Sequence, residues 1–183
     1  MPPNRQKPPA KPLDTALLEA LALHYAARFA TSRAKLAAYL NRKIRERGWA
    51  DEGSGPDVGA LVARLTDLRY VDDEAFAAMK GAALTRRGYG ARRVAQALDA
   101  AGIAGDERST TLDRSRAAAW HAADVFARKR RIGPYATRKV EREDRQKQVA
   151  AFVRAGHDFA TAALWVDADP GQVPPGPDED ELL

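Results

Sequence analysis

Apolar residues recur at helical spacing along most of the chain. Leu36, Leu40 and Ile44 are four positions apart, the spacing that places side chains on one face of an α-helix. The same spacing recurs within segments 13–25 and 58–68. No stretch has the alternation of apolar and polar residues that is typical of a half-buried strand. The pattern predicts an all-α protein.

One helical segment recurs three times, at 32–40, 90–98 and 145–153. Each copy has a polar or turn-like start, basic residues in its first turns and apolar residues four apart. Another helix is predicted before each copy, at about 13–29, 74–87 and 115–131, and a third helix follows the first and last copies, at 57–69 and 158–166. Each copy is followed by a glycine that can end a helix: Gly48, Gly102 and Gly156.

These recurring helix starts and glycine stops predict three tandem three-helix repeats, at 13–72, 73–113 and 114–166. The flanking segments are rich in proline, which disfavours helices. We therefore expect a disordered basic leader at 1–12 and a disordered acidic tail at 167–183.

Composition narrows the possible functions. The 183 residues include no cysteine, which excludes disulfides, thiolate nucleophiles and cysteine-ligated zinc. No apolar run approaches the roughly 20 residues of a membrane span, and no secretory signal is evident. We expect a cytoplasmic protein that does not contact a membrane.

The sequence carries no pattern typical of catalysis. His24, His121 and His157 are far apart and lack the spacing of metal ligands. The acidic run at 72–74 could attract a hard cation, but it is better explained as a helix start, with Asp72 as cap. Phosphate-loop and serine-nucleophile signatures are absent. We expect no catalytic residue, no metal and no cofactor.

Clustered positive charge indicates a function more clearly than any catalytic pattern does. Four arginines surround a predicted tight turn at 88–90, and no acidic residue falls within 80–93. Two of them, Arg92 and Arg93, lie near a helix N-terminus, where local helix stability does not explain a cation. A solvated charged face is the alternative explanation, and the run at 128–131 could simply end a helix. The candidate partner-binding residues are Arg33, Lys35, Arg86, Arg87, Tyr89, Arg92, Arg93, Arg128, Lys129, Arg130 and Arg131.

Two motifs resemble the RecX family of bacterial recombination regulators. The first is Tyr70-Val71-Asp72-Asp73-Glu74-Ala75-Phe76-Ala77; the second is Arg87-Gly88-Tyr89-Gly90 with Arg92-Arg93, followed by Gly102-Ile103. The resemblance covers about 13–166 and is strongest in 60–105. The chain departs from the family pattern at Ala75, where arginine is usual, and at Ala91, where proline is usual.

The resemblance implies three helical modules in an elongated, curved molecule. It also implies binding to the RecA–DNA nucleoprotein filament, with its single-stranded DNA, and suppression of recombinase and coprotease activity without a cofactor. We expect a monomer that binds bare DNA weakly at most. Two alternatives stay open: a stand-alone helix-turn-helix-like DNA-binding protein, in which Arg92 and Arg93 grip DNA, and a helical scaffold whose charge serves solubility.

Overall fold

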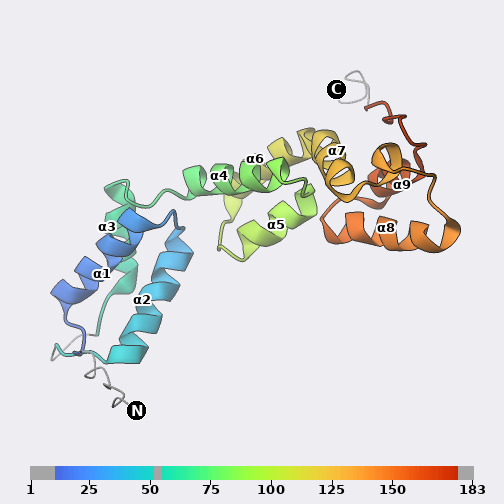
Figure 1. The fold of residues 1–183 in the computed structure, drawn as a ribbon. Coiled ribbons are helices and arrows are strands. Elements are labelled where there is room, and N and C mark those ends of the chain that lie inside the picture. The colour runs from blue at the N-terminus through green and yellow to red at the C-terminus, as the bar shows by residue number, and fades with distance from the viewer. Residues whose placement is uncertain (1–10, 52–54, 177–183) are drawn as a thin grey trace, which may run out of the picture. The chain divides into compact units, whose positions relative to one another are not determined.

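The computed structural model describes residues 11–51 and 55–176, and in this part of the chain helices joined by turns and loops make up the fold (Figure 1). This confirms the predicted all-α class. The chain forms two compact units that divide between Asp73 and Glu74. Besides one short 3-10 helix, Gly133–Tyr135, the described helices are α1 (Thr15–Arg28), α2 (Arg33–Arg47), α3 (Val58–Asp67), α4 (Asp73–Arg86), α5 (Ala91–Asp99), α6 (Gly105–Ala117), α7 (Ala119–Arg130), α8 (Arg142–Arg154) and α9 (Phe159–Asp167).

Side-chain caps start the helices of the first unit. Asp14 accepts a hydrogen bond from the Leu17 amide, and Ser32 accepts one from the Lys35 amide, so each satisfies a backbone N–H that a helix start leaves unpaired. At the other end of α2, Gly48 adopts a positive φ of 80°, as the predicted helix stop requires.

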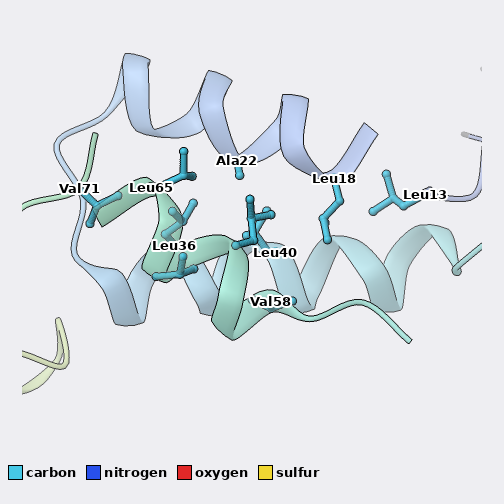
Figure 2. Close-up of a cluster of buried hydrophobic side chains, with 10 residues drawn as sticks. Leu13, Leu18, Ala22, Leu36, Leu40, Val58, Leu65 and Val71 are labelled. Carbon is cyan, nitrogen blue, oxygen red and sulfur yellow. The ribbon is translucent and has the colours of Figure 1, made fainter. Parts of the chain in front are cut away.

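A leucine- and valine-rich core joins the three helices of the first unit (Figure 2). Leu18 of α1 and Leu36 and Leu40 of α2 are buried in it. The apolar periodicity identified these positions from the sequence. The remaining members of the cluster are Leu13, Ala22, Val58, Leu61, Val62, Leu65 and Val71.

The start of α2 is also tied to the end of the first unit. The Asp73 carboxylate accepts hydrogen bonds from the backbone amide and from Nε of Arg33, each at 2.8 Å. Asp73 is the first residue of α4, at the helix start that the sequence predicts. Its carboxylate also stabilises the N-terminus of α2, a contact between residues far apart in the chain.

The second unit contains two buried clusters. One joins α4, α5 and α6 through Phe76, Val94 and Leu112. The other joins α7, α8 and α9 through Phe126, Phe152 and Trp165. The predicted boundary between repeats at 113/114 falls inside α6, and the helix expected at 115–131 is therefore too long at its N-terminal end. Residues 113–117 contain no glycine or proline that would break a helix, so α6 continues to Ala117. The division into three repeats stays a prediction, in keeping with one buried cluster among each successive three helices.

Two turns meet at close range within the second unit. The Gly90 amide donates to the Ala155 carbonyl at 3.0 Å, and the Arg92 amide donates to the Gly156 carbonyl at 3.2 Å. The backbones approach so closely that a Cβ on Gly90 would lie 2.4 Å from the Gly156 oxygen. The turn between α4 and α5 is thus fixed against the turn between α8 and α9.

His157 completes this contact. Because its partner is a carbonyl, Nε2 must carry the proton that it donates to the Gly88 oxygen at 3.0 Å. The ring is buried against Phe126 and Phe152. Burial lowers the pKa of His157 below the usual histidine value, and this effect outweighs the opposing hydrogen bond to Gly88.

Residues 167–176, which we expected to belong to a disordered tail, are described by the structure and form specific contacts. Asp167 and Asp169 form ion pairs with Arg145 and Lys139 at 2.6 and 2.8 Å, and the Gly171 amide donates to a backbone carbonyl. The Arg145 guanidinium lowers the pKa of the Asp167 carboxyl. These contacts hold residues that proline content alone marks as irregular. The leader residues 1–10 and the tail residues 177–183 lie outside the described residues.

Candidate anion-binding groove

A groove of about 450 Å³ opens on the second unit beside the contact between the two turns. Three segments form it: the α4–α5 turn, the last turns of α7 and the end of α8. Its lining residues are Arg87, Tyr89, Phe126, Lys129, Arg130, Ala151, Arg154 and Ala155.

Helix geometry explains why cations gather there. Lys129 and Arg130 lie in the last turn of α7, and Arg154 is the last residue of α8. The partial negative charge at a helix C-terminus favours basic side chains at all three positions. Two local contacts shape the wall: Lys129 Nζ donates to the Arg87 carbonyl at 3.0 Å, and the Arg130 guanidinium lies 5.8 Å from the Phe126 ring centroid.

The positive charge of the groove is not balanced by acidic residues among those that line it. Four lining residues are basic and none is acidic. Within the described part of the chain, no carboxylate forms an ion pair with Arg87, Arg130 or Arg154, and all three are exposed. Several like charges facing one opening repel each other, and an anionic partner with oxygens for their N–H groups would relieve that repulsion.

The groove joins two clusters that the sequence analysis treated separately. Arg87 and Tyr89 come from the predicted 86–93 site, and Lys129 and Arg130 come from the 128–131 run. Arg154 also lines the groove but is not among the candidates predicted from the sequence. The sequence shows a basic residue two positions before the helix-ending Gly156, as at many helix C-termini. Only the packing of α8 against the α4–α5 turn brings this residue to the groove.

Two other candidates from the 128–131 run do not line the groove. Arg128 donates to the Tyr135 hydroxyl at 3.0 Å, pairs with Asp124 at 3.2 Å, and lies 4.9 Å from the centroid of the Tyr135 ring. The hydrogen bond to Tyr135 and the charge of Asp124 raise the pKa of Arg128. Arg131 ends α7 with a positive φ of 54° and does not line the groove. Arg128 thus has partners within the protein, whereas Arg131 is exposed at the end of α7.

The arginines flanking the 88–90 turn point to different surfaces. Arg86 lines a pocket between α4 and α6, whereas Arg92 lines a pocket of about 480 Å³ that also contains Arg108 and Arg116. Arg93 Nη1 donates to the Gln96 side chain at 3.3 Å. Only Arg87 of these four lines the groove.

The two candidates of the first unit lie at the start of α2. Arg33 is bound to Asp73, although half of its side chain remains exposed, and Lys35 is exposed. The structure gives Arg33 a folding role that its charge alone did not suggest.

Metal binding and membrane insertion have no structural counterpart in residues 11–51 and 55–176. No cluster of three or more His, Cys, Asp or Glu side chains is placed to hold a metal ion there. None of the helices in these ranges is long and apolar enough to cross a bilayer. Asp73 and Glu74 are the first two residues of α4.

A helical fold with a groove lined by cations and no acid is typical of proteins that bind polyanions. No protein-family sequence model matches the chain. It is 32% identical over 180 residues to the regulatory protein RecX of Myxococcus xanthus (strain DK1622), covering 91% of this chain and 94% of that protein. It is 34% identical over 129 residues to the regulatory protein RecX of Agrobacterium fabrum (strain C58 / ATCC 33970), covering 67% and 66% of the two chains. The chain therefore belongs to the RecX family of regulatory proteins.

Solved structures agree at the level of the fold. The crystal structure of RecX from Lactobacillus salivarius aligns with a TM-score of 0.61 at 15% identity, over 80% of this chain and 90% of that one. A second crystal structure, of a regulatory protein RecX, aligns with a TM-score of 0.56 at 19% identity, over 80% and 70%. At these identities the similarity concerns the fold alone.

Proposed function

We propose that this protein binds the RecA–DNA nucleoprotein filament and suppresses the recombinase and coprotease activities of RecA. Family membership supports the regulatory role, and the cationic groove of the second unit is the observation that carries the binding mode. On this proposal the protein acts as a monomer, needs no cofactor and is not an enzyme. Arg87, Lys129, Arg130 and Arg154 contact the DNA backbone within the filament.

Electrostatics favours this partner. Filament-bound DNA presents phosphates at regular intervals, and each phosphate contact displaces condensed counterions, so binding weakens steeply with salt. Arginine can meet a phosphate through two parallel N–H donors, a geometry that lysine cannot match. Three of the four groove cations are arginines. We therefore expect the affinity for the filament to fall as the salt concentration rises.

The alternative of a stand-alone helix-turn-helix-like protein is less well supported. In that fold the first turn of a recognition helix enters a DNA groove. Here the corresponding turn of α5 is occupied by protein: Gly90 is buried, and the Gly90 and Arg92 amides donate to Ala155 and Gly156. The backbone at the start of α5 is therefore covered by the turn between α8 and α9, which limits its access to a DNA groove.

The decisive experiment compares two charge-reversal pairs in the full chain. Arg87→Glu with Arg154→Glu changes the groove, whereas Arg138→Glu with Arg142→Glu makes the same change in net charge at exposed positions outside it. Binding is measured at matched salt to single-stranded DNA, duplex DNA and RecA-coated single-stranded DNA. Inhibition of RecA strand exchange is measured in parallel.

We expect wild type and the control pair to prefer the coated filament and to inhibit strand exchange. The groove pair should lose at least about tenfold in filament affinity, with a shallower salt dependence. Arg92→Glu with Arg93→Glu, at the start of α5, tests the site that the sequence favoured. If those changes abolish inhibition while the groove pair does not, the groove is the wrong site. Equal binding to bare DNA and filament would favour the stand-alone alternative.

A further inference from the structure

A column of three aromatic rings lies on the first unit, at the end of α1 and along α2. Tyr25 and Tyr39 stack with ring centroids 4.1 Å apart and planes 20° apart. Phe29 continues the column, with its centroid 5.2 Å from that of Tyr25 and its plane tilted by 49°. The apolar periodicity of the sequence does not mark this arrangement, because the rings come from two helices.

Phe29 is not needed for the core. It is 49% exposed and lies outside the buried cluster, whereas Tyr25 and Tyr39 pack against the edge of that cluster. Its backbone amide ends α1 by donating to the Tyr25 carbonyl at 3.0 Å, a role that any residue but proline could fill. Folding therefore does not explain an exposed aromatic ring at this position.

Cations flank the column at both ends. The Arg28 guanidinium lies 5.6 Å from the Phe29 centroid. The Arg42 guanidinium and the Lys43 ammonium lie 5.6 and 5.9 Å from the Tyr39 centroid. Glu46 pairs with Lys43 at 2.7 Å and lies 3.6 Å from Arg42, so one positive charge at the Tyr39 end is balanced. Arg42 keeps 58% of its side chain exposed and Arg28 is exposed, which leaves both able to meet an anion.

We propose that this column binds single-stranded nucleic acid, with a base stacked on the exposed face of Phe29 and neighbouring phosphates on Arg28 and Arg42. Every base has a π-face, and cation-flanked aromatic platforms bind single strands with little sequence preference. Bases in a duplex are already stacked and cannot reach the ring. An acidic protein surface would use the two arginines but would gain little from the ring, which makes Phe29 the discriminating residue.

The test uses the full chain with Arg87→Glu and Arg154→Glu in every variant, so that the groove does not mask the column. Fluorescence anisotropy measures the binding of a labelled oligothymidine and of an abasic strand of equal length. Phe29→Leu keeps an apolar side chain without a π-face, Phe29→Trp keeps the π-face, and Leu23→Ala removes another exposed apolar side chain of α1 as a control. Circular dichroism checks that each variant keeps its helicity.

We expect Phe29→Leu to weaken oligothymidine binding about 5- to 100-fold, and Phe29→Trp and Leu23→Ala to leave it within about twofold. The abasic strand should bind all variants equally. Glu46→Gln should strengthen binding, because it frees the two cations at the Tyr39 end. The proposal is overturned if Phe29→Leu binds like its parent, or if the abasic strand or a duplex binds as tightly as oligothymidine. Because no RecA is present, these outcomes are independent of filament binding.

Discussion

The contact between Gly90 and Gly156 makes a strong prediction about stability. Gly90 has φ −77° and ψ 169°, a conformation open to alanine, so Gly90→Ala introduces no backbone strain. Its new Cβ would lie 2.4, 2.5 and 2.6 Å from the Gly156 oxygen, the Gly156 carbonyl carbon and the His157 nitrogen. All three are backbone atoms, which cannot rotate out of the way as a side chain would.

The cost follows from the bonds that hold the turns together. A carbon and an oxygen need roughly 1 Å more than the available 2.4 Å, so the turns must separate by about that much. Hydrogen bonds of 3.0, 3.2 and 3.0 Å, from the Gly90 amide, the Arg92 amide and His157 Nε2, would then exceed bonding distance. At about 1 kcal/mol for each lost bond, and more for a buried group left unpaired, the loss is about 3–5 kcal/mol.

Hydrogen exchange followed by mass spectrometry provides the assay, because it resolves the two units within one chain. Amides at 88–94 and 153–158 should exchange roughly 100-fold faster or more in Gly90→Ala, while those of α1–α3 serve as the internal reference. Gly59→Ala in α3 is the matched control, since its Cβ would meet only an Asp57 carboxylate oxygen at 3.4 Å. Alanine there should be neutral or stabilise by up to about 1 kcal/mol. Protection at the two turns within about 0.5 kcal/mol of wild type in Gly90→Ala would refute the reasoning.

Three further changes test the packing of each unit. Asp73→Ala removes the carboxylate that binds Arg33 and should lower the free energy of unfolding of the first unit by about 1–2 kcal/mol in urea denaturation; no change would mean that solvent replaces this cap. Phe152→Ala, at a fully buried ring, should cost the second unit about 3–5 kcal/mol, and a loss below 1 kcal/mol would contradict the described core. Burial lowers the pKa of His157, so the imidazole takes up a proton when the protein unfolds below about pH 6.5. The free energy of unfolding should therefore be highest above about pH 6.5 and fall below it, by at most about 1.4 kcal/mol for each pH unit. His157→Gln, which can still donate to Gly88, should flatten this slope between pH 5 and 7, and an unchanged slope would assign it to other groups.

Helix starts and stops could be predicted from the sequence because they depend on residues within one or two turns. Ser32 caps α2, Gly48 ends it, and Leu36 and Leu40 are buried on its core face, all from signals a few residues apart. The start of α7 was predicted too early, because no glycine or proline near residue 117 marks the end of α6 in the sequence.

Tertiary structure decided which basic residues share a surface. Sequence spacing separates Arg87, Lys129 and Arg154, but the docking of the α4–α5 turn against α7 and α8 brings them to one groove. The tertiary structure also places Arg33 beside Asp73 and Arg128 beside Tyr135, contacts that charge alone did not indicate. The sequence by itself determined the helices, because their hydrogen bonds and apolar faces repeat every few residues. The binding surfaces depend on contacts between distant segments, which local periodicity does not encode.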